Sequence, residues 1–210
     1  MAVQHLLAAF DGWREQRKPL VLATIVETLG STYSKAGTHM LIEPGGDFEG
    51  LVSGGCLEGD LVEHAREVLE NGRPKLVVYD MRDEEADQVW GLGLGCNGAV
   101  RIFLQALDPV SGYEPFMAMS RLMRDAGRGA YALVIAENGA PPASPEWMVA
   151  GTAGVLSGSA SGGFLRDYCD AAANAGRVDN LQLDGTELEI FAAPVPVIPR
   201  ILLLGAGPDV

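Results

Sequence analysis

The sequence predicts a mixed α/β protein, in which helices flank layers of β-sheet. Two observations lead to this class. Segments with apolar residues at helical spacing alternate with short β-branched runs, and turns rich in glycine and proline separate them. The chain has 210 residues, of which 48% are apolar and 20% are charged. That balance is ordinary for a globular protein with a substantial core.

The first half of the chain is expected to hold two helices and five strands. Apolar residues recur at helical spacing over 3–18 and 56–71, while apolar and β-branched runs indicate strands at 20–28, 38–43, 48–53, 75–81 and 100–107. The turn "PGGD" joins the second and third of these strands into a hairpin. Pro19 ends the first helix, and Gly72 and Pro74 end the second.

The second half follows loosely the same order. Residues 108–115, "DPVSGYEP", have the composition of a linker or long turn. We then expect a helix at 115–126, a strand at 130–137, a second strand after a proline-rich loop, a helix at 164–175, and a hairpin around Asp184–Gly185. Because no residue-level repeat is visible, internal duplication stays a hypothesis.

The end of the sequence, "ILLLGAGPDV", is an apolar strand that runs into Gly205-Ala206-Gly207. A dinucleotide-binding βα turn begins in this way. Either the chain stops just inside a further, Rossmann-like domain, or the strand closes the sheet of the second half. We therefore divide the chain into an N-terminal domain at 1–107, a second α+β segment or linker subdomain at 108–198, and the truncated start of a Rossmann-like domain at 199–210.

The charge and the cysteine content exclude several classes of protein. A net charge of −13 argues against binding to nucleic acid or to an anionic membrane surface, because both need clustered Lys and Arg. No apolar run is long enough to span a bilayer, and no signal peptide is visible. The three cysteines lack the spacing of a disulfide framework, so a reducing cytoplasm is the expected compartment.

The stretch "VSGGCLEGD", residues 52–60, sets a cysteine behind two glycines at an expected helix start. The backbone N–H groups of Gly54, Gly55 and Cys56 would then bind an anion, and the thiol would gain thiolate character. Glu58 and Asp60 complement the helix dipole but oppose a thiolate. The alternative is a plain strand–turn–helix junction that holds a small buried cysteine.

A second glycine-rich stretch, "GLGLGCNG" at 91–98, contains Cys96 and precedes the strand at 100–107. A thiolate there would suit a soft metal centre, although an irregular turn explains the glycines equally well. Cys-x-x-Cys spacing is absent, so a closed zinc or iron–sulfur site is not expected. By residue type alone, His39 and His64 could complete a four-ligand metal set with the two cysteines.

A third stretch, "LGSTYSKAGTHM" at 29–40, offers hydroxyl groups and one cation. The hydroxyl groups of Ser31, Thr32, Tyr33 and Ser34 and the cation of Lys35 could hold a phosphate or a polar heterocycle, or the loop could simply be solvated. Motifs of serine hydrolases, zinc proteases and P-loop nucleotidases are absent from the sequence.

Taken in order, "GSTYSKAGTHM" (30–40), "SGGCLEG" (53–59) and "GLGCNG" (93–98) resemble the motifs of the XdhC/CoxI family. Members are accessory factors for the maturation of xanthine dehydrogenase and related molybdenum hydroxylases. Many also carry a C-terminal Rossmann-like domain, as "ILLLGAGPDV" suggests. In this sequence Val210 stands where the third glycine of the dinucleotide fingerprint would be, so NAD(P) binding is doubtful.

The resemblance implies a non-enzymatic carrier that binds the molybdenum cofactor (molybdopterin) transiently and delivers it to an apo-enzyme. Sulfuration of the metal would bring in a cysteine desulfurase. Cys96 or Cys56 would face molybdenum or its sulfur, and glycines and polar side chains would hold the rest of the cofactor. The residues that would contact the cofactor, as the resemblance implies, are Cys56, Cys96, Gly54, Gly55, Gly95, Ser31, Lys35 and Glu58.

Two other functions stay open. Gly205-Ala206-Gly207 could belong to an NAD(P)-dependent oxidoreductase, and Cys56, Cys96 and a histidine could form a small metal-binding interaction module. A homodimer is also conceivable if the chain exposes apolar faces. The sequence does not indicate which hydroxylase would be served.

Overall fold

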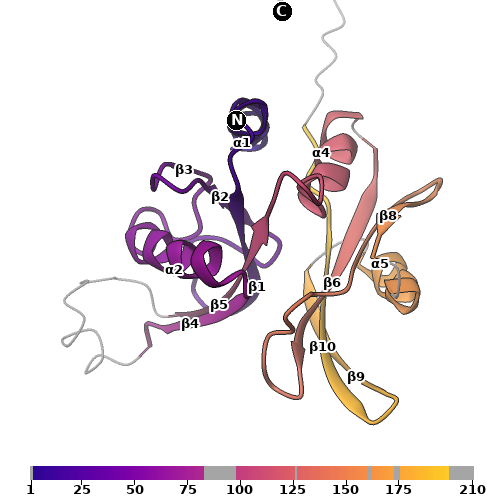
Figure 1. The fold of residues 1–210 in the computed structure, drawn as a ribbon. Coiled ribbons are helices and arrows are strands. Elements are labelled where there is room, and N and C mark those ends of the chain that lie inside the picture. The colour runs from indigo at the N-terminus through magenta and orange to yellow at the C-terminus, as the bar shows by residue number, and fades with distance from the viewer. Residues whose placement is uncertain (1, 83–97, 126, 160–161, 173–175, 199–210) are drawn as a thin grey trace, which may run out of the picture.

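The computed structural model describes residues 2–82, 98–125, 127–159, 162–172 and 176–198. In this part of the chain, two five-stranded antiparallel sheets lie face to face with helices around them (Figure 1). The predicted mixed α/β class is confirmed. Among the described residues, no helix has the length and apolar character needed to cross a membrane.

The first sheet has the strand order β3-β2-β1-β5-β4. Its central strand β1 (Leu20–Gly30) pairs with β5 (Gly98–Leu107) along its whole length. Helix α1 precedes β1, and helix α2 connects β3 to β4. The remaining elements are α1 (Ala2–Glu15), β2 (His39–Ile42), β3 (Phe48–Glu49), α2 (Glu58–Asn71) and β4 (Lys75–Asp80).

The second sheet has the strand order β8-β7-β6-β10-β9. Its central strand β6 (Gly129–Glu137) follows helix α4 (Phe116–Asp125). The remaining elements are β7 (Trp147–Gly151), β8 (Gly154–Gly158), the 3₁₀ helix η1 (Gly162–Leu165), α5 (Arg166–Ala171), β9 (Arg177–Leu183) and β10 (Thr186–Pro194).

The two halves share one topology. In each sheet the first strand of the half is central, the second and third extend to one side, and the fifth and fourth extend to the other. Each half also begins with a helix and places a second helix between its third and fourth strands. The duplication hypothesis thus gains topological support.

A short sequence match accompanies this shared topology. "SGGCL" at 53–57 and "SGGFL" at 161–165 stand at the same point of the element order, and each ends in a buried leucine that directly precedes a helix. This short match is consistent with the duplication hypothesis, which stays a hypothesis. The match is easily overlooked in the sequence, because only four residues are identical.

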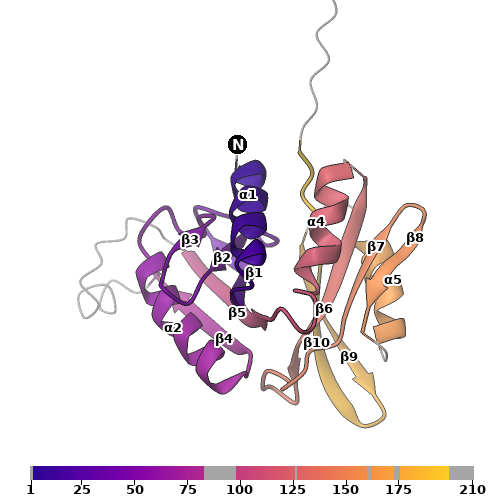
Figure 2. The same ribbon diagram turned by 45° about the horizontal axis from the view of Figure 1, so that its top comes forward.

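Three layers of apolar side chains hold the elements together. Alternate residues of β1 face opposite ways: Leu20 and Leu22 lie in the core between the sheets, while Val21 and Ala23 lie in the core under α2. A third core lies between the second sheet and α5. Helices α1 and α4 close one end of the middle core (Figure 2). There the rings of Phe10 and Phe116 pack edge to face, with centroids 4.9 Å apart.

Some predicted boundaries are wrong, and glycines explain the largest error. The strand predicted at 48–53 ends at Glu49. Gly50 has a φ of 100°, and a Cβ there would lie 2.4 Å from the carbonyl oxygen of His39. Only glycine permits this close crossing, which turns the chain out of the sheet.

The helix predicted from residue 56 begins at Glu58, because Gly54 and Gly55 have φ values of 80° and 115°. Helix α1 ends at Glu15 rather than near 18, where Arg17 takes a left-handed φ of 55°. The helix predicted at 164–175 starts as η1 at Gly162, and α5 ends at Ala171. One predicted strand after the proline-rich loop is in fact the hairpin β7–β8.

The hairpin predicted around "DG" is confirmed. Asp184 and Gly185 have φ values of 49° and 83°, and they connect β9 to β10. Two consecutive positive φ angles are what a type I′ hairpin turn requires. Residues 199–210 lie outside the described residues, so the strand and turn predicted there, and the division of the chain into domains, stay predictions.

Candidate functional site

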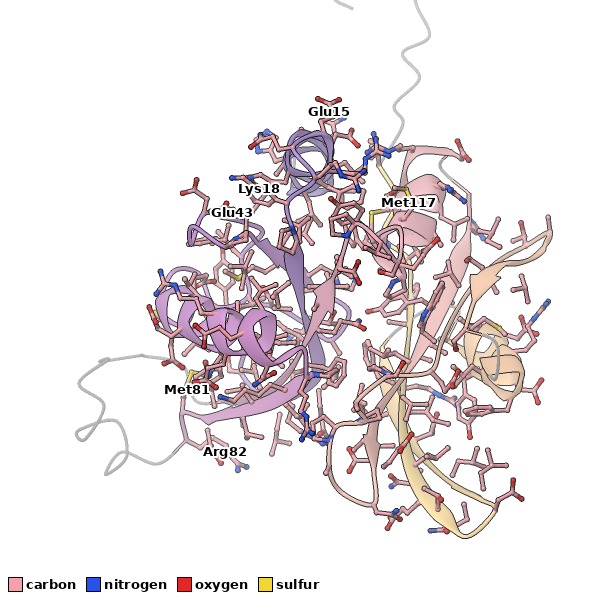
Figure 3. The ribbon with its side chains drawn as sticks, in the orientation of Figure 1. Glu15, Lys18, Glu43, Met81, Arg82 and Met117 are labelled. Carbon is pink, nitrogen blue, oxygen red and sulfur yellow. The ribbon has the colours of Figure 1, made fainter. Side chains whose placement is uncertain are left out.

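A hollow of about 280 Å³, counting its open mouth, lies at one end of the first sheet. The loop after β1, the loop before α2 and the neighbouring ends of β4 and β5 meet around it. Met81, which directly follows β4, is one of its walls (Figure 3). The lining residues are Thr32, Tyr33, Val52, Ser53, Cys56, Leu57, Met81 and Val100.

The loop before α2 is organised by a carboxylate. Glu58 is 2% exposed, and its Oε1 accepts hydrogen bonds from the backbone N–H groups of Val52 and Ser53, both at 2.9 Å. Its Oε2 accepts from the N–H of Gly55 at 3.0 Å and from the hydroxyl of Ser53. The hydroxyl oxygen of Ser53 in turn accepts from the N–H of Leu57 at 2.8 Å. These bonds fix the backbone from 52 to 58.

The hydrogen bonds also set the charge state of Glu58. Burial alone would raise the pKa of the carboxyl, but the bonds from the Ser53 hydroxyl and from the nearby backbone N–H groups outweigh it and lower the pKa below its ordinary value. Of the three N–H groups that the sequence predicts to bind an external anion, the protein's own carboxylate takes that of Gly55.

Two expectations for this loop need correction. The helix begins two residues after Cys56, so the thiol does not sit in the first helical turn as predicted. The family resemblance implies that Glu58 contacts the cofactor. In the structure its carboxylate is buried and accepts hydrogen bonds from the backbone of its own loop. Its observed role is to position the loop. The local sequence could not reveal this role, because acidic residues are common in the first turn of a helix, where they interact favourably with the helix dipole.

Cys56 is an accessible thiol. It is exposed and lines the hollow, and a Cβ placed on the neighbouring Gly55 would meet no atom within 4 Å. The alternative of a small buried cysteine is therefore wrong here. Cys169 shows the contrast: it is buried on α5, its thiol donates to the Met148 carbonyl at 3.7 Å, and burial with the nearby Asp170 raises its pKa to about 12.

Gly54 makes room for an aromatic ring. A Cβ at Gly54 would lie 3.1 Å from two ring carbons of Tyr33, so the ring rests against the Gly54 backbone. Tyr33 is nevertheless 65% exposed. The sequence indicates Tyr33 only as a hydroxyl donor of its loop. The contact of its ring with Gly54 was not predicted, because the two residues are distant in sequence and no local pattern pairs them. The only signal in the sequence was an aromatic residue inside a polar loop.

Ser31 and Lys35 lie on the same loop as Thr32 and Tyr33, and both are exposed. Neither is among the residues that line the hollow. Ser31 instead lies close to β5, where a Cβ on Gly98 would come within 2.5 Å of the Ser31 carbonyl oxygen. The structure thus brings these residues near the hollow, and their contact with a ligand stays a prediction.

Cys96 and Gly95 lie outside the described residues. Their described neighbour in sequence is Gly98, whose carbonyl accepts from the N–H of Met81 at 2.9 Å. Because Met81 lines the hollow, β5 begins beside it. The convergence of the two cysteines on one site remains a prediction.

The histidines do not join Cys56. His39 is buried between the sheets: its Nδ1 lies 3.1 Å from the Thr24 hydroxyl, its ring contacts that of Tyr131, and burial lowers its pKa to about 4. His64 pairs with Asp60 at 3.3 Å on α2. Within the described residues, no group of three or more His, Cys, Asp or Glu side chains is placed to hold a metal ion.

The segment that carries the first two glycine-rich motifs matches the model of one protein family. Residues 13–80 match the XdhC and CoxI family, which confirms the resemblance drawn from the motifs. This segment carries the first two motifs and Cys56.

Known proteins resemble about half of the chain. It is 40% identical over 97 residues to a Bacillus subtilis protein described as a probable xanthine dehydrogenase subunit, covering 46% of this chain and 29% of that protein. It is 31% identical over 102 residues to the molybdenum cofactor insertion chaperone PaoD of Escherichia coli, covering 49% of this chain and 30% of that protein.

A solved structure extends the likeness to more of the chain. The crystal structure of a protein described as a xanthine dehydrogenase from Bacillus halodurans superposes with a TM-score of 0.56 at 32% identity. The match covers 71% of this chain and 42% of that one. The chain thus spans less than a third of the two curated relatives and under half of the structural neighbour.

Proposed function

We propose that the protein is an accessory factor that binds the molybdenum cofactor and delivers it to a molybdenum hydroxylase such as xanthine dehydrogenase. The observation that carries the proposal is an exposed thiol, Cys56, in a hollow on the segment that matches the XdhC and CoxI family. The names of the Bacillus subtilis and Escherichia coli relatives point to the same process of enzyme maturation.

The chemistry of the hollow suits this cargo. The hollow is open to solvent, so a ligand larger than the hollow itself can reach Cys56 from outside. A thiolate at Cys56 is a soft ligand for molybdenum or its sulfur, and Cys96 would add a second. The open mouth lets a bound cofactor leave toward a client enzyme.

The phosphate of the cofactor needs a different place from the one that the sequence suggests. Glu58 already accepts the N–H groups of Val52, Ser53 and Gly55, and its negative charge would repel a phosphate there. Lys35 is the cation on the adjacent loop. We assign the phosphate to the side of the hollow that faces residues 31–35, where Ser31 also offers a hydroxyl.

Delivery requires a client surface and a source of sulfur. Leu29 and Leu51 are exposed on the segments that flank the hollow, and they would contact the apo-hydroxylase. A cysteine desulfurase would supply sulfur to the bound metal. The oxidoreductase alternative depends on Gly205-Ala206-Gly207, which lies outside the described residues, and the metal-module alternative gains no observation in its favour from the part of the chain that the structure describes.

Replacing Cys56 with serine should lower the molybdenum that co-purifies with the protein at least about tenfold, because even an outer-shell partner of a metal contributes that much to affinity. Molybdenum is measured by mass spectrometry after expression in a host that makes the cofactor. The matched control is Cys169→Ala, a cysteine change away from the hollow, which should retain the wild-type amount. Equal molybdenum in Cys56→Ser and wild type would refute the proposed function.

A further inference from the structure

We infer that Tyr33 is a stacking platform for the planar heterocycle of the cargo, and hence that the hollow recognises a pterin-like ring through an aromatic face. The inference rests on the proposed function and names a binding residue for the same site. It starts from the position of the Tyr33 ring relative to Gly54 and to the hollow.

One side of the Tyr33 ring is supported by backbone. A Cβ built on Gly54 would lie 3.1 Å from Cδ2, 3.1 Å from Cε2 and 3.4 Å from Cγ of Tyr33. These three distances place the ring directly against the Gly54 backbone. Since the residue is 65% exposed, most of the remaining ring surface is open. Tyr33 also lines the hollow that contains Cys56.

The backbone on both sides of Tyr33 is tied down. The hydroxyl of Thr32 donates to the carbonyl of Ser34 at 2.8 Å, which spans Tyr33 within its own loop. The hydroxyl of Ser34 donates to the carbonyl of Leu51 at 3.1 Å, which joins this loop to the one before α2. The backbone that carries the ring is therefore held in place, so less ordering of this loop is needed when a ligand binds.

An open aromatic face in a hollow suits a flat heterocycle. Nucleic-acid bases stack on such rings, and any planar π-system of similar size can do so in an offset geometry. Cys56 and Tyr33 line the same hollow, so one ligand can contact both. The two residues divide the recognition: the thiol addresses the metal or its sulfur, and the ring addresses the heterocycle.

The test uses a metal-free fluorescent pterin, neopterin, titrated into the purified protein while quenching of its fluorescence is followed. Tyr33→Leu should weaken binding about tenfold or more, the loss typical of one stacked base, whereas Tyr33→Phe should stay within about threefold of wild type. Phe48→Leu is the matched control, because Phe48 is another exposed aromatic of the first sheet that does not line the hollow. It should leave neopterin binding unchanged.

Two results would overturn the inference: wild-type protein that does not bind neopterin, or Tyr33→Leu binding as tightly as wild type. Loss of binding in Tyr33→Phe equal to that in Tyr33→Leu would also overturn it, because it would assign recognition to the hydroxyl. None of these results affects the molybdenum retention that tests Cys56. Failure of the stacking role is therefore distinguishable from failure of the proposed function.

Discussion

Replacing Phe103 with alanine should lower the free energy of unfolding by about 3–5 kcal/mol. Phe103 is fully buried on β5, in the core that the two sheets share with α1 and α4. Removing its ring deletes apolar contacts from both sheets and leaves a cavity that the surrounding strands cannot close. Urea denaturation followed by circular dichroism measures the change.

Phe48→Ala is the control for this substitution, because Phe48 is a 40% exposed phenylalanine of the same sheet. It should change the free energy of unfolding by less than about 1 kcal/mol. If the two variants lost equal stability, the placement of Phe103 between the sheets would be wrong.

Replacing Glu58 with glutamine should lower the free energy of unfolding by roughly 2–3 kcal/mol at pH 7. The buried carboxylate accepts from three backbone N–H groups and one hydroxyl, and an amide can accept through only one of its two terminal atoms. The amide nitrogen, which is itself a donor, would then face N–H or O–H donors instead of an acceptor. Thermal and urea unfolding of the variant and the wild type give the difference.

The difference between wild type and Glu58→Gln should depend on pH. The folded pKa of Glu58 is lowered, so its contribution is fully present above the unfolded value of about 4.3 and is lost as pH falls through the lower folded pKa. The two proteins should therefore converge in stability toward acid pH. Glu63→Gln, an exposed carboxylate on the same helix, should stay within about 0.5 kcal/mol of wild type. A pH-independent gap would contradict the assigned role of Glu58.

Local patterns in the sequence predict most of the elements. The β-branched run from residue 20 defines β1, and Asp184–Gly185 defines the last hairpin, because these signals depend only on neighbouring residues. The boundaries near Gly50 and Gly54 could not be predicted. They depend on close contacts with His39 and Tyr33, and no periodicity encodes which distant residue a glycine will touch.

The candidate site was predicted only in part. The sequence singled out Cys56 and its glycines, and the structure places that thiol in an accessible hollow. The role of Glu58 was not predicted, because it depends on the chain folding back so that one carboxylate reaches backbone from 52 to 55. Tyr33 was expected only as a hydroxyl donor, and the placement of its ring was not predicted for the same reason: its contact with Gly54 exists only once both loops are in place.

The second half of the chain serves as an internal comparison. At its equivalent junction, Phe164 stands where Cys56 does, and it packs against the core beneath α5. Arg166 stands where Glu58 does, and it pairs with Asp170 at 3.1 Å. The shared glycines and leucine thus belong to the strand-to-helix junction. The thiol and the buried carboxylate distinguish the first half, which locates the proposed chemistry there.

Alkylation of the individual cysteines, with and without bound molybdenum cofactor, tests the central claim most directly. Iodoacetamide is added to the native protein, and modification of each cysteine is followed by peptide mass spectrometry. Cys56 should react readily in the free protein and be protected when the cofactor is bound, while the buried Cys169 should stay unmodified in both states. Alkylation of Cys56 at the same rate in the loaded protein would show that the cofactor does not bind at this thiol.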